Sequence, residues 1–351
     1  MKNIVFDCER MKYSNTGLYH YCLNLGHHIQ NRVNPSTENL SFFIPGQAGL
    51  VFGKKEQYIF QNSLQKFFMP PLGKFHIWHA TYQSSHYLPK RNKKIKVVLS
   101  IHDLNFLYEN KSTVSLTRHL RHLQENIDRS DAIVCISEFC RRDVLRHCVI
   151  GDKPVYVIYN GANDLKTPAL SQSSYKPRKP FLFSLGVITR KKNFHALLPL
   201  LKNRNLEFLI AGKHDDIDYV GYIKQLAKKL NVFDKLRMIG AVTEQEKSWY
   251  YHNCYAFAFP SIAEGFGLPV VEAMNAGKPL FLSNKTSLPE VGSNVAFYFH
   301  DFSEQTIQNV FEKGMSDYEK NNMENVIRER GRSFSWERAA QQYLEVYRAL
   351  S

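Results

Sequence analysis

Ten short apolar runs recur along the chain, and amphipathic segments of helical length lie between them. Strands that alternate with helices form parallel sheets, because each helix carries the chain back to the edge where the next strand begins. The predicted strands of the first half are 4–8, 75–80, 96–104, 132–137 and 155–161, and those of the second half are 181–186, 207–212, 236–241, 256–261 and 279–284. Five strands in each half predict two doubly wound α/β domains.

A polar segment marks the boundary between these domains. The chain has 351 residues, more than one domain usually holds. Residues 162–180 are rich in Ser, Pro and Lys, a composition typical of a linker. We therefore predict an N-terminal domain over residues 1–165 and a C-terminal domain over 166–335.

The last residues, 336–351, carry large apolar side chains at helical spacing. The steps of four and three predict a helix with one apolar and aromatic stripe, which packs back on the N-terminal domain. The stripe consists of Trp336, Ala340, Tyr343, Tyr347 and Leu350.

Composition indicates a soluble protein of the cytoplasm. No apolar run approaches the ~18 residues of a membrane-spanning helix, and the opening MKNIVFDCER becomes charged too early for a signal peptide. The six cysteines form no C-x2-C pair, so we expect reduced, mostly buried thiols and no metal.

The net charge of +14 is uneven, with +9 in residues 1–170 and +5 in the remainder. This excess favours an anionic partner for the first half of the chain. Nucleic acid, an acidic membrane surface and a phosphorylated small molecule all remain compatible with it. A predicted helix over 116–127 and the run KRNKKIK (90–96) add a basic surface, which is either a membrane contact or merely a solvated face.

The stretch AEGFGLPVVEAMNAGK (263–278) combines two glutamates, Glu264 and Glu272, with a glycine-bearing loop and a helix start. Pro269 suits the first residue of a helix and Gly277 suits the position after its last turn. The exposed N–H groups of a helix start bind anions, and glycines let a ligand approach the backbone closely. The alternative is that Glu272 only complements the helix dipole and Glu264 is solvated.

A second strand, loop and helix start lie in SLGVITRKKNFHALLPLL (184–201). Arg190, Lys191 and Lys192 occupy the loop, and Asn193 is a candidate N-cap. Three cations before a helix start suit a diphosphate, although a solvated basic turn is the alternative. Near the N-terminus, Gly17 opens another predicted helix without a G-x-G-x-x-G signature.

Together these segments resemble the retaining glycosyltransferases of family 4, the group 1 class, over nearly the whole chain. The most specific match is the E-x7-E signature of Glu264 to Glu272. Further matches follow in the expected order: SIHDL (100–104), CISEFCRRDVL (135–145), VIYNGAN (157–163), VITRKKN (187–193), IGAVTEQE (239–246), SLPEVGSNVAFYF (287–299) and FSWERAAQQYLEVY (334–347). The resemblance implies the GT-B fold, two Rossmann-like domains that face each other across a cleft.

The resemblance also implies a role for each matching residue. Glu264 would face the transferred sugar, Lys192 the diphosphate and Glu272 the nucleotide ribose. His102 would lie beside the donor sugar, and Gly17 would cover the phosphate from the N-terminal domain. The remaining donor-binding positions would be Gly240 to Val242 at the base and Gly265, Phe266, Gly267 and Leu268 at the sugar and phosphate.

One departure concerns the basic loop, where many members carry Gly-Arg and this chain has Gly186 followed by Val187. The second diphosphate cation is therefore Lys191 by position or Arg190 by residue type. Preorganised cations and helix N–H groups would stabilise the leaving diphosphate, so we expect no metal ion and no cofactor. As a lone histidine, His102 is also compatible with a core residue paired with Asp103.

The sequence thus predicts a retaining hexosyltransferase that uses a nucleoside diphosphate sugar, with a preference for GDP-mannose. The expected acceptor is a glycan or a polyprenyl-linked sugar of surface polysaccharide such as lipopolysaccharide O-antigen or capsule, reached from the cytoplasm with peripheral contact to an anionic membrane. A nucleotide-sugar 2-epimerase shares the architecture, but its carboxylate and histidine set cannot be placed here. A nucleic-acid-binding protein would interleave aromatic and basic residues in a known module, which this chain lacks, so we expect no nucleic acid partner.

Overall fold

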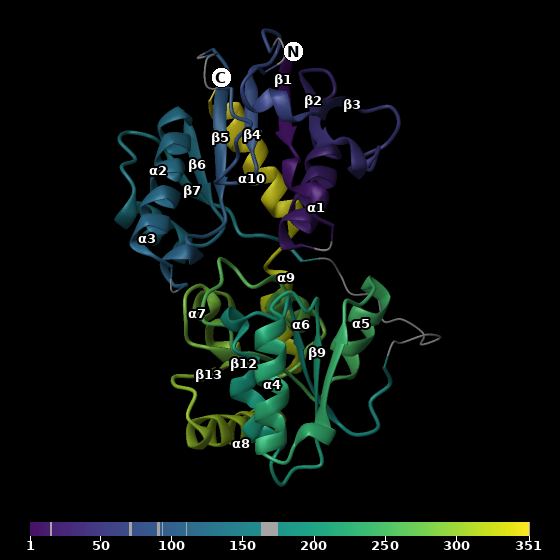
Figure 1. The fold of residues 1–351 in the computed structure, drawn as a ribbon. Helices are drawn as coiled ribbons and strands as arrows, with labels where there is room; N and C mark the ends of the chain where they lie inside the picture. Colours follow the sequence, from purple (N-terminus) through teal and green to yellow (C-terminus); the bar gives the residue numbers. More distant parts are fainter. Residues whose placement is uncertain are drawn as a thin grey trace. The chain divides into compact units, whose positions relative to one another are not determined.

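The computed structural model describes residues 1–14, 16–69, 72–89, 92, 94–109, 111–162 and 175–350. The chain divides into two compact units, shown in Figure 1. Unit 1 comprises Met1–Gly161 and Ser335–Ser351, and unit 2 comprises Ala162–Phe334. The predicted boundary at 165 and 166, and most of the predicted linker, lie outside the described residues.

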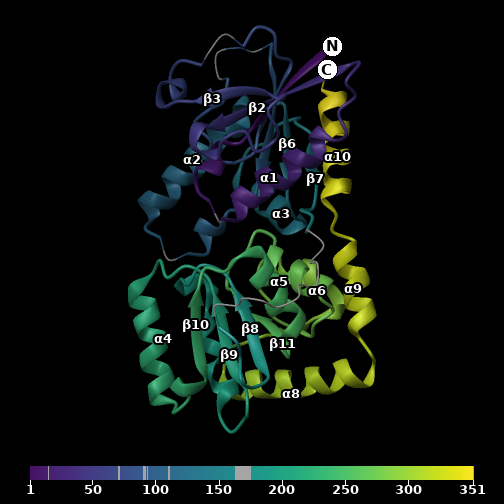
Figure 2. The same cartoon turned by 90° about the vertical axis from the view of Figure 1, so that its right-hand side faces the viewer.

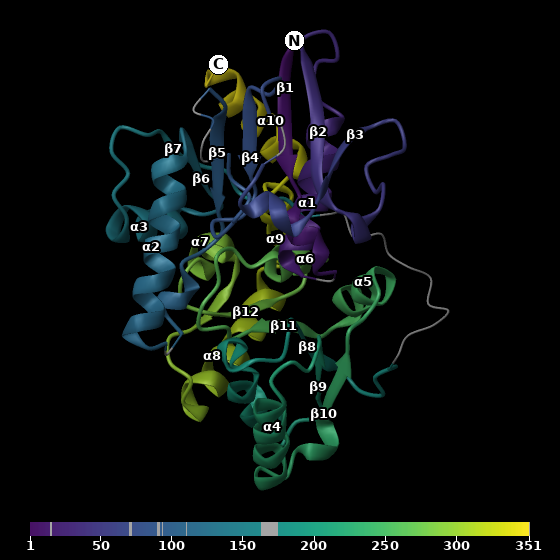
Figure 3. The same ribbon diagram turned by 45° about the horizontal axis from the view of Figure 1, so that its top comes forward.

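Unit 1 is built on a seven-stranded sheet in which every pair of neighbours is parallel. The order is β3-β2-β1-β4-β5-β6-β7, and Figure 3 shows it most openly. Its strands are β1 (Lys2–Asp7), β2 (Glu38–Pro45), β3 (Gln57–Gln61), β4 (Ile77–Ala80), β5 (Lys96–Ile101), β6 (Ala132–Cys135) and β7 (Val155–Val157). Its α-helices are α1 (Gly17–Gln30), α2 (Thr113–Arg129), α3 (Glu138–His147) and α10 (Trp336–Ala349), and its 3₁₀ helices are η1 (Glu9–Lys12), η2 (Gly46–Ala48), η3 (Ser63–Lys66) and η4 (Asn105–Leu107).

Unit 2 contains a six-stranded parallel sheet in the order β10-β9-β8-β11-β12-β13. Its strands are β8 (Phe181–Leu185), β9 (Glu207–Ala211), β10 (Leu236–Gly240), β11 (Ala256–Phe259), β12 (Leu280–Ser283) and β13 (Phe297–Phe299). Its α-helices are α4 (Ile217–Lys229), α5 (Glu244–Asn253), α6 (Leu268–Asn275), α7 (Leu288–Gly292), α8 (Glu304–Lys320) and α9 (Glu324–Arg332), and its 3₁₀ helices are η5 (Arg190–Lys192), η6 (Phe194–Leu201), η7 (Phe233–Lys235) and η8 (Ser293–Val295).

All ten strands predicted from the apolar runs are present, and the two parallel-sheet domains are confirmed. The prediction of five strands in each half is wrong, because β2, β3 and β13 were missed. β3 is an edge strand whose side chains are only partly buried, and β13 has three residues. Neither carries the long apolar run that identifies a central parallel strand.

The C-terminal helix α10 belongs to unit 1 and lies beside α1 (Figure 2). The predicted stripe is buried at four of its five positions, and Leu350 is partly exposed. Two of its tyrosines also bond into the core: the Tyr343 hydroxyl lies 2.8 Å from the Tyr21 hydroxyl, and the Tyr347 hydroxyl lies 2.6 Å from Nδ1 of His79. The stripe therefore holds the end of the chain on the first sheet by both packing and hydrogen bonds.

The structure also describes the state of the cysteines and the length of the helices. All six cysteines are free thiols, and five of them are buried. Within the described ranges, no helix is both long enough and apolar enough to cross a bilayer.

Each sheet has one point where the chain changes the side on which it adds strands. In unit 1 this point lies between β1 and β4, and in unit 2 it lies between β8 and β11. Loops diverge at such a point, so the carboxyl ends of these two strands form the place where doubly wound sheets bind ligands.

Candidate functional site

The basic loop of unit 2 follows the carboxyl end of β8 and is fixed to the end of β11. The Lys191 carbonyl accepts hydrogen bonds from the Ile262 N–H at 2.9 Å and from the Ser261 hydroxyl at 3.2 Å. These bonds join the two strands that flank the change of direction in the sheet. The loop therefore lies where the topology predicts a ligand.

Glycine is required beside this loop. Gly186 and Gly212 have φ values of 149° and 148°. A Cβ on Gly212 would lie 1.9 Å from the Gly186 carbonyl oxygen, and a Cβ on Gly186 would lie 3.1 Å from Cε of Lys192. Because neither glycine has a Cβ, the backbones of Gly186 and Gly212 can approach each other and the Lys192 side chain can lie beside Gly186.

Lys192 forms an ion pair with Glu264, the first glutamate of the E-x7-E stretch. Nζ lies 2.5 Å from Oε1, and both side chains are largely buried, with 14% and 13% of their surface exposed. The ammonium also lies 4.6 Å from the ring centroid of Phe259. A charge pair this well enclosed is screened far less than a surface pair.

The backbone of Glu264 is held by the loop that follows β12. Its N–H donates to the Thr286 hydroxyl at 2.9 Å, and its carbonyl accepts from the Ser287 hydroxyl at 2.9 Å. These two residues were not predicted as part of the site. They hold the backbone from which the Glu264 side chain reaches Lys192.

Helix α6 begins directly after this glutamate without a side-chain cap. Seven other helices have a Ser, Thr or Asp N-cap whose side chain accepts from the first turn, namely α1, α2, α3, α4, α5, α8 and α10. The N-cap of α6 is Gly267, with φ 98°, and it forms no side-chain cap hydrogen bond. Leu268 is the first helical residue and Pro269 the second, one position later than predicted. An uncapped helix start is the arrangement that accepts an anion.

Glu272 lies on the same helix and binds two side chains of α5. Its Oε1 lies 2.7 Å from Nζ of Lys247, and its Oε2 accepts from the Tyr251 hydroxyl at 2.9 Å. Nζ of Lys247 also lies 2.9 Å from Glu244. Burial lowers the pKa of Lys247, but the Glu272 and Glu244 carboxylates outweigh it and raise this pKa above its usual value. Both carboxylate oxygens of Glu272 are therefore held in place by side chains of α5.

The sequence analysis missed Lys247 and Tyr251. Their spacing of four places them on one face of α5, after a capping box formed by Thr243 and Glu246. The spacing alone does not reveal the partner, because Glu272 lies 25 residues away along the chain.

The remaining predicted donor-site residues are distributed around this core. Arg190 lies 5.7 Å from the ring centroids of both Tyr219 and Tyr222 on α4. The Phe266 side chain is buried and contacts Phe334 edge to face, so only its backbone could meet a ligand. Gly240 ends β10 with φ 76° and leads through Val242 into α5.

The prediction that Asn193 caps a helix is wrong. Asn193 precedes the 3₁₀ helix η6 but has φ 55°, and its side chain makes no cap bond. In the left-handed conformation it ends the basic loop sharply, so the loop is shaped by its backbone turn.

In unit 1, His102 follows β5 and is buried. Its Nε2 lies 2.8 Å from the Thr81 carbonyl, and its backbone N–H donates to the Gln83 side chain at 3.1 Å. Burial lowers the pKa of His102 to about 4, so the ring is neutral at physiological pH. The predicted alternative, a ring paired with Asp103, is replaced by this contact to the backbone of Thr81.

Two buried carboxyl groups lie at the carboxyl end of β1, Asp7 as the last residue of the strand and Glu9 two residues later. The Ser85 hydroxyl lies 3.1 Å from Glu9 and 3.4 Å from Asp7, and the Thr81 hydroxyl donates to the Asp7 carbonyl at 2.6 Å. Burial raises the pKa of Glu9 to about 7 and raises that of Asp7 well above its usual value. Gly17 starts α1 close by in sequence, and a Cβ there would meet no atom within 4 Å.

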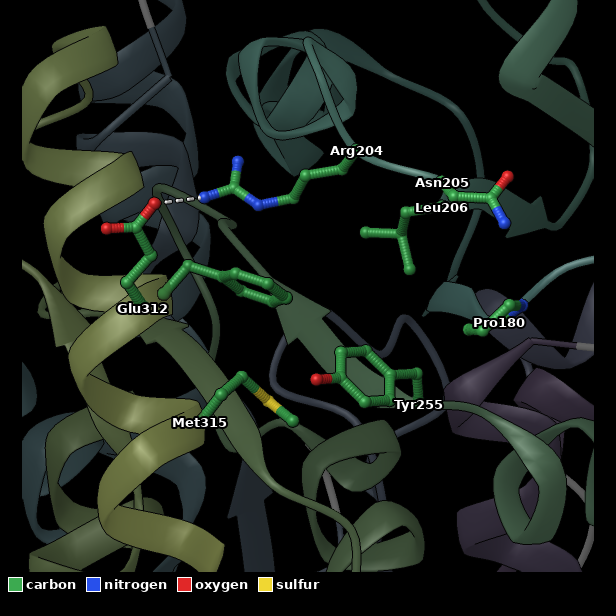
Figure 4. A pocket seen from close by; sticks show the side chains of 8 residues that line it. Pro180, Arg204, Asn205, Leu206, Tyr255, Glu312 and Met315 are labelled. Carbon is green, nitrogen blue, oxygen red and sulfur yellow. Dashed lines mark hydrogen bonds and ion pairs between the residues drawn. The ribbon is translucent and has the colours of Figure 1, made fainter.

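A pocket of about 460 Å³ lies at the opposite edge of the second sheet (Figure 4). Its lining includes Pro180 and Tyr255, which directly precede β8 and β11, and Phe311 of α8. An ion pair of 2.6 Å between Arg204 and Glu312 borders it. Because it adjoins the amino ends of the strands, this pocket is separate from the Lys192 and Glu264 cluster.

The chain matches two family models, which meet near the boundary of the two units. The model of glycosyl transferases group 1 matches residues 167–334, and that of Glycosyltransferase Family 4 matches residues 41–164.

Among curated proteins, the chain is similar to the O-antigen chain mannosyltransferase B of Escherichia coli, with 25% identity over 79% of this chain and 75% of the relative. It is also 30% identical to the serotype-specific mannosyltransferase WbdA of Escherichia coli over 66% of this chain, but spans only 30% of that longer protein. The O-antigen chain mannosyltransferase RfbU of Salmonella typhimurium is 25% identical over 60% of this chain and 58% of its own length.

Solved structures share the fold at low identity. Sucrose-phosphate synthase from Thermosynechococcus elongatus has a TM-score of 0.79 at 18% identity, covering 100% of this chain and 99% of its own. Anabaena Alr3699/HepE in complex with UDP-glucose has a TM-score of 0.75 at 16% identity, covering 99% of this chain and 100% of its own.

Proposed function

The chain belongs to the group 1 glycosyltransferases of family 4, and we propose that it transfers mannose from GDP-mannose to a lipid-linked glycan of the O-antigen type. The observation that carries this proposal is the pair of glutamates in unit 2, each held by its own lysine beside an uncapped helix start. The mannose preference is supported by the relatives named as O-antigen mannosyltransferases.

The two ends of the donor would meet different glutamates. Glu264 would accept hydrogen bonds from the sugar hydroxyls, and Glu272 would accept them from the ribose. The diphosphate would lie between them, at the start of α6 and beside Lys192. Lys192 would then exchange its contact with Glu264 for one with the phosphate, and the sugar hydroxyls would take its place at the carboxylate.

The second cation on the diphosphate would be Lys191. Arg190 has the preferred side-chain type, but its guanidinium lies over two tyrosine rings of α4. Such cation–π contacts stabilise a cation away from its alternative partners by about 0.5–1 kcal/mol each. Reaching the diphosphate would require Arg190 to leave both rings.

In the reaction the bond between the anomeric carbon and the diphosphate oxygen breaks, and a bond from the acceptor oxygen to the same carbon forms. Positive charge develops on the sugar and negative charge on the leaving diphosphate. Lys191, Lys192 and the N–H groups of α6 would stabilise that negative charge without reorganising, so no metal ion is needed. Attack on the face that the diphosphate leaves, with the acceptor proton passing to a phosphate oxygen, would retain the anomeric configuration.

Unit 1 would bind the acceptor, with His102 as a neutral hydrogen-bonding group beside the donor sugar and Gly17 next to the phosphate. To reach a lipid-linked acceptor, the enzyme would have to bind at the cytoplasmic face of a membrane. The exposed Arg118 and Arg121 of α2 are the cations proposed for contact with anionic lipid, whereas three of the seven residues of the predicted basic run 90–96 lie outside the described residues.

A thermal-shift panel of GDP-, UDP- and ADP-sugars tests the proposal. A donor that binds the folded state stabilises it by about 2.7 kcal/mol at a hundredfold excess over its dissociation constant. We expect GDP-mannose to raise the melting temperature of the unaltered chain most. The Lys192→Met variant should show no shift with this ligand. A larger shift with a UDP- or ADP-sugar would show that this sugar nucleotide, and not GDP-mannose, is the donor. If no sugar nucleotide shifts the melting temperature, the proposed function is wrong.

A further inference from the structure

One short turn of unit 1 has its polarity reversed relative to a normal surface turn. In η3 and the residues after it, the polar side chain of Gln65 is buried, with 8% of the residue exposed. Leu64, Phe67 and Phe68 are instead 72%, 73% and 71% exposed. Phe60, at the end of the edge strand β3, is 53% exposed and belongs to the same stretch. We call Phe60, Leu64, Phe67 and Phe68 the apolar turn surface.

Hydrogen bonds fix this arrangement, so the exposure is built into the fold. Asn62 accepts from the N–H groups of Leu64 and Gln65, and Gln65 accepts from the Asn62 N–H at 2.8 Å in a complete capping box. The Gln65 amide also donates to the Phe60 carbonyl at 3.3 Å. The polar groups satisfy one another inward, which leaves the leucine and phenylalanines to point outward.

Exposed lysines accompany the apolar side chains. Lys54, Lys55, Lys66 and Lys74 are all exposed, whereas Glu56 is the single acidic residue of the sequence from 54 to 74. Exposed apolar side chains gathered within residues 60–68 indicate a binding surface, and exposed lysines close to them in the sequence favour an anionic partner. A second copy of the chain would bring the same lysines to the contact, and like charges would oppose such a dimer.

We propose that the apolar turn surface inserts between the headgroups of an anionic lipid bilayer, with the surrounding lysines on the lipid phosphates. Aromatic and leucine side chains next to lysines are the combination that binds the membrane interface. The proposal draws on the proposed function only because a membrane-borne acceptor gives this surface a use. It differs from the contact proposed for α2, which is purely basic.

The test is flotation of the full chain with vesicles of phosphatidylcholine, with and without phosphatidylglycerol. Phe67→Ser combined with Phe68→Ser should weaken binding to the anionic vesicles at least tenfold, with little change in melting temperature because neither ring packs in the core. The control is Ile217→Ser combined with Val326→Ser, since these side chains are 70% and 44% exposed and both belong to unit 2. The control should bind vesicles as the unaltered chain does.

Three further results separate the alternatives. Lys66→Gln with Lys74→Gln should weaken binding to anionic vesicles and leave the weak binding to neutral vesicles unchanged. If Phe67→Ser with Phe68→Ser floats like the unaltered chain while Arg118→Gln with Arg121→Gln does not, the α2 contact is the membrane site and this proposal is wrong. If the double Phe variant only changes the mass in light scattering, the surface is a contact between copies.

The GDP-mannose thermal shift, measured on the same samples, keeps this proposal distinct from the donor assignment. If the double Phe variant keeps the GDP-mannose thermal shift but no longer floats with the vesicles, the result supports the membrane surface. An unaltered chain that floats without any donor shift contradicts the proposed function alone.

Discussion

Replacing Lys247 by Met should destabilise unit 2 more than any change at a surface ion pair, because it leaves Glu272 without its cation. The two charges lie 2.7 Å apart, with 11% and 15% of their side chains exposed. At an effective dielectric constant near 20 their Coulomb attraction is about 6 kcal/mol. Desolvation offsets much of this, and the loss of one partner of a buried pair costs about 3 kcal/mol.

The control is Lys202→Met. Lys202 pairs with Glu304 at 2.8 Å, almost the same distance, but 31% and 49% of these side chains are exposed. An exposed pair contributes only about 0.2–1 kcal/mol. Two pairs of nearly equal length thus differ in burial, and the account predicts that burial decides the cost.

Equilibrium urea denaturation followed by fluorescence and circular dichroism measures both changes. Trp249 is two residues from Lys247 and is the only tryptophan of residues 162–334, so it reports on unit 2. Adding Glu272→Gln to Lys247→Met should recover most of the lost stability, because no unpaired charge remains. If Lys247→Met costs less than about 1 kcal/mol, as an exposed pair does, the buried pair does not hold Glu272 in place.

Three other changes test separate parts of the account. Gly212→Ala should destabilise unit 2 by about 2 kcal/mol or more, since its Cβ would meet the Gly186 carbonyl. The control Gly221→Ala has open space in α4 and should be neutral or stabilising, so equal urea midpoints for the two variants would contradict this. Glu9→Gln should flatten the pH dependence of stability, because the unfolded carboxyl ionises near pH 4.5 and the folded one at about 7. Between these values the unaltered chain should lose more free energy of unfolding than the variant, in which the raised pKa of Asp7 still contributes, and parallel curves would refute this. His102→Ala should lower turnover by about a hundredfold without loss of GDP-mannose binding, and near-normal turnover would show that the ring serves only the core.

Ten of the thirteen strands in the described residues were predicted, because a buried parallel strand is usually apolar on both faces. The buried strand β2 was missed because its first half, ENLS, is mostly polar. The edge strand β3 was missed because its side chains are exposed or only partly buried. The E-x7-E stretch could be recognised because its glycines, proline and glutamates lie within one loop and one helix.

The partners that orient those glutamates could not be predicted. Lys247 reaches Glu272 from another helix, and Ser287 reaches the Glu264 backbone across 23 residues. Such pairs depend on how the elements pack, which local spacing does not contain. Asn193 shows the same limit, since its side chain suits an N-cap and its backbone takes the left-handed conformation instead.

The most direct test of the central claim is a calorimetric titration of GDP and GDP-mannose into Glu264→Gln and Glu272→Gln. Glu264→Gln should bind GDP at least as tightly as the unaltered chain does, because Lys192 no longer has to leave a carboxylate to reach the phosphate. It should lose the additional affinity for GDP-mannose, because the sugar contact is weakened. Glu272→Gln should weaken both ligands at least tenfold, since a hydrogen bond to a charged group contributes about 1.5–3 kcal/mol. If both variants bind both ligands as the unaltered chain does, the two glutamates do not hold the two ends of the donor.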